Sequence, residues 1–159
     1  MKKILLVTAI LGIGITHSIA QTWQDQTFPV VEDFFDINFP DNCIGYAFGD
    51  RGVMVKTFNR GGTWSSLSIS DPLNYRFEAS HFFDAQTGIL VGEYQPTGDG
   101  FTIWTYDGGS TWTDLNSSIA SRLWDVHFAT DNIGWVVGDL AYIARTLDKG
   151  VTWVNQVAP

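Results

Sequence analysis

The sequence has few residues that crosslink a chain or mark a catalytic centre. It contains one cysteine, Cys43, so no disulfide can form within the chain and the fold must be stabilised by packing. We expect Cys43 to be a small buried residue in a strand rather than a reactive thiol. The sequence has no phosphate-binding glycine loop, Gly-x-Ser-x-Gly elbow or His-Glu-x-x-His motif, so it does not indicate the enzyme classes that they mark.

Positive charge is also scarce, with 9 Lys and Arg against 17 Asp and Glu. Residues 1–20 are predicted to be a signal peptide, because Lys2 and Lys3 precede an apolar run over 4–15 that is shorter than the ~20 residues needed to span a bilayer. Cleavage before Gln21 removes both lysines and no acid, which leaves seven basic and seventeen acidic residues and a net charge of −10. We therefore expect a secreted, periplasmic or cell-surface protein that neither binds nucleic acid nor inserts into a membrane.

What the sequence does contain is an internal repeat. Eight residues of the form Thr-x-(Asp/Asn)-x-Gly-x-Thr-Trp occur three times. The Asp or Asn side chain can accept bonds from backbone N–H groups ahead of it, Gly can take a positive φ, and Thr and Trp favour strands. Each copy is therefore predicted to be a hairpin turn whose Trp packs between sheets. The defined positions are Thr57, Asn59, Gly61, Thr63 and Trp64; Thr105, Asp107, Gly109, Thr111 and Trp112; and Thr146, Asp148, Gly150, Thr152 and Trp153.

The segments between the copies also align, and they predict four strands in each repeat. The tryptophans that end the copies are 48 and 41 residues apart, which fits the ~40–50 residues of one propeller blade. We expect a lead-in over 21–32 and a three-blade segment over 33–159, with repeats at about 33–75, 76–121 and 122–157. The extra residues of the second repeat are expected to form a Pro/Gly-rich loop over 94–100, and 117–121 to be a connection between blades.

The eight-residue pattern resembles the Asp-box, or bacterial neuraminidase repeat. The copies ending at Trp112 and Trp153 match its defined positions, and the first has Asn59 in place of Asp. The segment 134–139 and the box after it are most similar to the propeller repeats of photosystem II stability and assembly factors, which also occur in exported bacterial proteins. The resemblance implies an all-β fold, a partial β-propeller of three four-stranded antiparallel blades. It also implies that the boxes are structural and lie away from the ligand-binding face.

Three blades are too few for the usual closed ring of ~4–8 blades. Further blades of a longer polypeptide, self-association, or a persistent open arc would each account for this number. We favour them in that order, because the sequence ends at Pro159 directly after the strand that follows the third box.

A few polar residues are candidates for contact with a ligand. Asn38, His81 and His127 align near the end of the first strand of each blade, which lines the central channel of a propeller. Two histidines without a third ligand do not indicate a metal site, and no cofactor is expected. Arg76 and Arg122 align at the start of the same strand and could grip a carboxylate or phosphate, but a third arginine, as in the sialidase cluster, is missing.

Two functions remain open. The preferred one is a non-catalytic exported scaffold or binding module that contacts a protein or a glycan through its loop faces. The alternative is a segment of a sialidase-like or xyloglucan-active glycoside hydrolase, for which a loop-face carboxylate such as Glu93 or Asp99 would be essential. Asp50, Glu93 and Asp139 follow a strand-ending Gly at equivalent positions, which favours a role in stabilising turns. Tyr94 and Trp104 could stack on a sugar or a peptide, but Trp104 lies on a predicted strand, where a tryptophan is more often part of the core.

Overall fold

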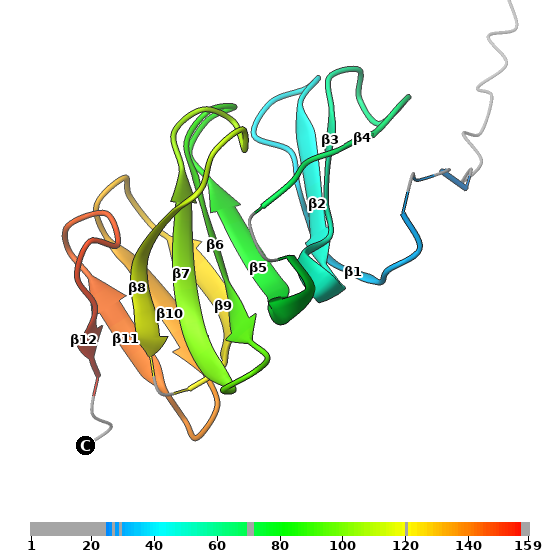
Figure 1. Ribbon diagram of the computed structural model, residues 1–159. Coiled ribbons are helices and arrows are strands. Elements are labelled where there is room, and N and C mark those ends of the chain that lie inside the picture. Colours follow the sequence, from blue (N-terminus) through cyan, green and yellow to red (C-terminus); the bar gives the residue numbers. More distant parts are fainter. Residues whose placement is uncertain (1–24, 27, 29, 70–71, 120, 157–159) are drawn as a thin grey trace, which may run out of the picture.

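The chain folds into three antiparallel sheets of four strands (Figure 1), and these are the blades of an open propeller. The computed structural model describes residues 25, 26, 28, 30–69, 72–119 and 121–156. The partial propeller of three four-stranded blades that the sequence predicts is therefore confirmed. The predicted signal peptide, 1–20, and part of the predicted lead-in lie outside the described residues.

Each blade uses four strands that are consecutive in the chain, and neighbours in sequence are neighbours in the sheet. Two short 3₁₀ turns, η1 (Asp50–Gly52) and η2 (Pro72–Asn74), are the helical elements of the described residues. In that part of the chain, no helix combines the length and the apolar character that a bilayer crossing requires. Blade 1 consists of β1 (Phe34–Asn38), β2 (Gly45–Gly49), β3 (Met54–Thr57) and β4 (Ser65–Ser66); blade 2 of β5 (Tyr75–Phe82), β6 (Gly88–Tyr94), β7 (Asp99–Thr105) and β8 (Thr113–Ile119); and blade 3 of β9 (Leu123–Phe128), β10 (Gly134–Gly138), β11 (Ile143–Thr146) and β12 (Val154–Asn155).

The first strands of the blades, β1, β5 and β9, lie next to one another, with β5 in contact with both of the others. Figure 1 shows the three blades side by side, with blade 2 in the middle. Because successive residues of a strand point to opposite faces, β6 and β7 contribute alternate residues to each neighbouring blade. Blade 2 is therefore buried on both faces.

The hydrophobic core lies between the blades and forms two interfaces. The first interface packs blade 1 against blade 2, through Tyr46, Phe48, Met54, Phe77, Phe82, Leu90, Phe101 and Ile103. The second packs blade 2 against blade 3, through Ala79, Ile89, Val91, Trp104, Leu123, Val126, Phe128, Val136 and Ala144. Burial of this apolar area is the main favourable contribution to stability in a chain without a disulfide.

Two of the three tryptophans that end the boxes, Trp112 and Trp153, pack at these interfaces. The Trp112 ring lies edge-on to Phe48 of blade 1, with ring centroids 6.2 Å apart. Trp153 packs against the second interface in the same way. Trp64 lies 5.6 Å from Phe28, ring centroid to ring centroid, so a residue of the lead-in covers the first tryptophan.

The prediction for Cys43 is wrong, because this residue is exposed and lies in the turn between β1 and β2. The turn uses its backbone: the N–H of Cys43 donates to Asp41 Oδ1 at 2.6 Å, and its carbonyl accepts from the N–H of Arg60 at 3.0 Å. These backbone hydrogen bonds hold Cys43 in a surface turn, so its side chain does not reach the core.

The extra residues of the second repeat also differ from prediction. They do not form a long loop, because β6 and β7 continue to pair as far as Tyr94 and Asp99 and leave only 95–98 as a turn. The predicted connection over 117–121 is also wrong, since β8 runs on to Ile119, which pairs with Gly100 of β7. Longer strands satisfy the backbone groups that a long loop would leave to solvent.

Candidate functional site

The Asp-box turns are closed hydrogen-bonded units. Asp107 Oδ1 accepts from the Thr111 N–H at 2.8 Å and from the Thr105 hydroxyl at 2.9 Å, and Oδ2 accepts from the Thr111 hydroxyl at 2.7 Å. The Thr105 hydroxyl oxygen accepts in turn from the Gly109 N–H at 2.8 Å. The hydrogen bond from the Thr111 hydroxyl is the largest cause that lowers the pKa of Asp107. The lone pairs of this carboxylate are therefore used within its own turn.

The third box repeats this pattern around Asp148, and the first repeats it with one change. Asn59 Oδ1 accepts from the Thr63 N–H at 2.8 Å, but Asn59 Nδ2 donates to the Thr63 hydroxyl at 3.0 Å, so this last bond is reversed. The box glycines Gly61 and Gly109 have φ of +83° and +85°, in the region that favours glycine.

The turn of the second box is also held by the neighbouring blade. Lys56 of β3 donates from Nζ to the Gly108 carbonyl at 2.8 Å, and the Tyr46 hydroxyl donates to the Ala85 carbonyl at 2.7 Å. Burial raises the pKa of Tyr46 to about 12 and lowers the pKa of Lys56. The box end of blade 2 is thus part of the interface between blades, and it offers little to a ligand.

The two histidines that were predicted to line the channel lie close together. The His81 and His127 rings are 5.7 Å apart, centroid to centroid, and His81 also contacts Phe83 at 4.9 Å and Phe128 at 5.3 Å. Burial, and then the charge of His127, lowers the pKa of His81. Asn38 occupies the equivalent end of β1. No group of three His, Cys, Asp or Glu side chains among the described residues could hold a metal ion.

Arg76 and Arg122 are brought together, but by a carboxylate that the sequence reasoning missed. Arg76 Nε lies 2.8 Å from Glu78 Oε1, and Arg122 Nη2 pairs with the same oxygen. Arg122 Nη1 also lies 3.5 Å from Glu93 Oε2. An anionic ligand would have to compete with Glu78 for both guanidinium groups. The pairing of Arg76 with Glu78 could have been predicted from the sequence. Residues i and i+2 of a strand share a face, and Glu78 follows Arg76 by two positions.

The three equivalent acids after Gly49, Gly92 and Gly138 each contact a neighbouring element. Gly49 and Gly138 end their strands as predicted, whereas β6 continues past Gly92 to Tyr94. Asp50 Oδ1 accepts from Gln95 Nε2 at 3.3 Å, Asp139 Oδ1 accepts from Trp124 Nε1 at 2.7 Å, and Glu93 pairs with Arg122. The glycine before Glu93 is required by space, since a Cβ on Gly92 would lie 1.9 Å from a backbone carbonyl oxygen.

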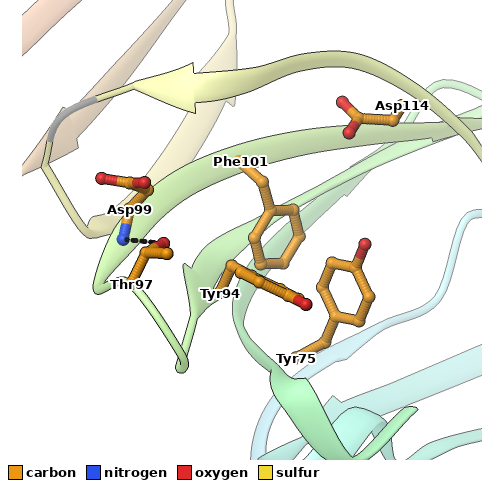
Figure 2. Close-up of a pocket in the computed structure, with 6 residues that line it drawn as sticks. All are labelled: Tyr75, Tyr94, Thr97, Asp99, Phe101 and Asp114. Carbon is orange, nitrogen blue, oxygen red and sulfur yellow. Dashed lines mark hydrogen bonds between the residues drawn. The ribbon is translucent and has the colours of Figure 1, made fainter. Parts of the chain in front are cut away.

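A pocket of about 360 Å³ opens on blade 2, mainly at the end away from its Asp-box, and extends along the blade to Asp114, which pairs with Ile103 of β7. Tyr75 begins β5, Tyr94 ends β6 and Asp99 begins β7, and these residues pair across the sheet, whereas the box follows the other end of β7. Figure 2 shows the rings beside the turn that joins β6 to β7, on which Thr97 lies. The pocket is lined by Tyr75, Tyr94, Thr97, Asp99, Phe101 and Asp114.

Three aromatic rings form the wall of this pocket. Tyr75 meets Tyr94 at 5.3 Å with an interplanar angle of 60°, and it meets Phe101 at 5.1 Å with an angle of 87°. Phe101 is only 1% exposed and belongs to the first interface, so it forms a rigid floor. Sequence reasoning proposed Tyr94 for stacking and Asp99 as a possible acid, but it missed Tyr75, Phe101 and Asp114.

The four-stranded blades, their Asp-box turns and the tryptophan-filled interfaces define the class of this protein as an Asp-box β-propeller. The chain belongs to the family whose model is described as photosynthesis system II assembly factor YCF48, which matches residues 15–120. No curated protein matches the chain significantly.

Solved structures share the fold. A YCF48 bound to a D1 peptide has 23% identity and a TM-score of 0.74 over 88% of this chain and 44% of that one. YCF48 from Cyanidioschyzon merolae has 24% identity and a TM-score of 0.70, over 85% and 43%. A GH74 enzyme from Niastella koreensis has 20% identity and a TM-score of 0.56, over 73% and 20%. The chain therefore spans less than half of the solved YCF48 chains, and at these identities the likeness shows the fold alone.

Proposed function

We propose that this chain is a non-catalytic binding module that holds a segment of a partner protein on the loop end of its blades, after export from the cell. The observation that carries the proposal is the aromatic pocket at the end of blade 2 opposite the Asp-box. The box end is occupied by the neighbouring blade, whereas the loop end presents a preformed concave site, as ligand sites usually do. The solved family member with a bound D1 peptide supports a protein partner over a glycan.

The test uses an array of 15-residue peptides beside an array of glycans, probed with the full chain. Two bulky substitutions at opposite ends of blade 2 form a matched pair: Thr97→Trp at the exposed rim of the pocket and Ser110→Trp in the exposed box turn. We expect peptides to bind, Thr97→Trp to abolish their binding and Ser110→Trp to leave it unchanged. Binding of glycans alone, or equal loss in both variants, would contradict the proposal.

The same preparations test the hydrolase alternative. Release of sugar from a sialoside or from xyloglucan by the full chain, lost in Glu93→Gln or Asp99→Asn, would favour a glycoside hydrolase over a binding module. Glu93 already pairs with Arg122, so its carboxylate is not freely available to a substrate.

We also propose that the outward face of blade 3 receives a further Asp-box blade. Trp135 and Arg145 are cross-strand partners at the positions that Tyr46 and Lys56 occupy in blade 1, where the latter pair holds the Gly108 turn. Val137 and Ile143 on this face are each 38% exposed, whereas their counterparts in blade 1, Phe48 and Met54, are 0% and 1% exposed. Within the described part of the chain, the buried Nε of Arg145 has no hydrogen-bond partner.

Sedimentation of the full chain at rising concentration tests whether a second copy supplies this blade. We expect concentration-dependent association that Arg145→Glu weakens and that the same change at the exposed Arg51 does not. A monomer at every concentration would rule out a second copy as the source of the blade.

A further inference from the structure

We propose that the blade 2 pocket is a cation site that takes the side chain of a lysine or an arginine. This inference rests on the proposed peptide-binding function and specifies which residue of the peptide anchors it. It is carried by three observations on the pocket: the arrangement of its rings, the charge of its lining and its restriction to one blade.

The rings enclose a space rather than offer a platform. Tyr75 stands at 60° to Tyr94 and at 87° to Phe101, so the rings border the cavity on different sides. A cation is attracted to the negative face of an aromatic ring, and rings set at steep angles can direct several faces to one cation. Phe101 is almost fully covered, so the ring faces open to a cation are those of the half-buried Tyr75 and Tyr94.

The lining carries negative charge and no positive charge. Asp99 and Asp114 are two of the six lining residues, and none of the six is basic. Figure 2 shows Asp99 at one side of the pocket and Asp114 on β8 at the other, with the rings between them. The nearest basic residue along the sequence, Arg76, pairs with Glu78. A carboxylate ligand would be repelled here, whereas an ammonium or guanidinium group would be attracted.

The blade fold itself does not require these aromatic residues. Tyr75 and Tyr94 pair directly across β5 and β6. When Gly92 is aligned with Gly49 of blade 1 and Gly138 of blade 3, Tyr94 corresponds to Arg51 and Leu140, and Tyr75 corresponds to Glu32 and Ser121. The other two blades therefore form without an aromatic pair at this end. A pocket volume near the lower limit for ligand sites suits a single side chain.

The test is a titration of the full chain, labelled with ¹⁵N, followed by NMR. The probes are the capped pentapeptide Gly-Ser-Lys-Ser-Gly, its arginine counterpart, its uncharged norleucine counterpart, its glutamate counterpart, and cellobiose. We expect the lysine and arginine peptides to shift the amides of 94–101, and the norleucine peptide to bind at least about tenfold more weakly, within the range of cation–π and ion-pair effects. The glutamate peptide and cellobiose should leave these amides unshifted.

Variants separate the rings from the charges. Tyr94→Ala should weaken the lysine peptide about tenfold or more, and Tyr94→Phe should retain its binding because the ring remains. Asp99→Asn and Asp114→Asn should each weaken it and reduce its dependence on salt. Tyr106→Ala is the matched control, since Tyr106 is an exposed aromatic residue in the box turn that follows β7 of the same blade, and it should have no effect.

The outcomes distinguish this inference from the function on which it rests. Equal binding of the lysine and norleucine peptides, or shifts with cellobiose alone, would overturn the cation site. If the peptides found on the array bind the Tyr94→Ala variant as well as the wild type, the peptide-binding function stands and the cation site fails. If the lysine probe binds but no array peptide does, the cation site stands and the proposed function fails.

Discussion

The two ends of blade 2 differ in whether their residues recur in the other blades. At the box end, Asp107 and the threonines around it form a hydrogen-bonded turn that recurs in all three blades, with the change to Asn59 in the first. At the loop end, Tyr75, Tyr94 and Phe101 form a pocket that neither of the other blades repeats in its residues. What recurs in every blade is explained by the needs of the fold, so the end that differs is where a ligand site should be sought.

The difference has an energetic basis. The box end contains buried backbone groups whose partners are supplied by the turn itself and by Lys56 of the neighbouring blade. Loss of such a partner leaves a buried polar group unsatisfied, which is costly. At the loop end, in contrast, Thr97 on the rim of the pocket is exposed.

Removal of a ring should show the largest contrast between the ends. We expect Trp112→Ala to lower the free energy of unfolding by about 3 kcal/mol, because the ring fills the first interface beside Phe48. Tyr94→Ala should cost about 1–2 kcal/mol, since its ring is half-buried at the rim of that interface. Urea unfolding of both variants measures the difference, and an equal cost at the two ends would remove the distinction drawn here.

A second pair of variants compares threonines. Thr105→Val should cost about 1–3 kcal/mol, because the buried N–H of Gly109 loses its acceptor. Thr97→Val, at the exposed loop end, should change the stability by less than about 0.5 kcal/mol. Chemical denaturation of the two variants under the same conditions is the measurement, and a larger effect at Thr97 would contradict the expectation.

The box end should also account for part of the loss of stability in acid. The folded state lowers the pKa of Asp107 and Asp148, so protons bind more readily to the unfolded chain. Their contribution is fully present above the unfolded value of ~4 and is lost as pH falls through the lowered folded values. Asp36 has the opposite effect on the pH dependence of stability, because burial raises its pKa and the folded chain binds its proton more readily.

Melting temperatures recorded between about pH 5 and pH 2 test this dependence. The double variant Asp107→Asn and Asp148→Asn, which imitates the first box, should lose less stability over that range than the wild type. Unchanged acid sensitivity in the double variant would show that other carboxylates govern the transition.

The smallest effect is expected at the first box. Asn59→Asp should change stability at neutral pH by less than about 0.5 kcal/mol, because the Thr63 hydroxyl can turn to donate as Thr111 does in the second box. The variant should instead become more sensitive to acid than the wild type. Thermal denaturation at pH 7 and at pH 3 measures both quantities, and a large loss at pH 7 would show that the amide is specifically required.

Much of the fold followed from local patterns. The Thr-x-Asp-x-Gly-x-Thr-Trp copies predicted the hairpin turns, and their spacing predicted the blades. The errors at 94–100 and 117–121 have one cause: glycine, proline and polar residues were read as loop, while strand pairing extended β6, β7 and β8 into them. The error at Cys43 is the opposite one, because a residue expected in a buried strand lies in an exposed turn. Whether Asn38, His81 and His127 face a ligand stays a prediction.

Turn chemistry and strand alternation act over eight to ten residues, so the sequence by itself determined the blade, its Asp-box and the number of repeats. The pocket and the ion pairs of Arg122 with Glu78 and Glu93 were decided only by the tertiary structure. Tyr75, Tyr94 and Asp114 are far apart in the chain, and they line one cavity because three strand pairings align the ends of β5, β6 and β7 beside β8. Local propensity does not predict that these three residues lie close together, because their proximity depends on the register of the strands between them.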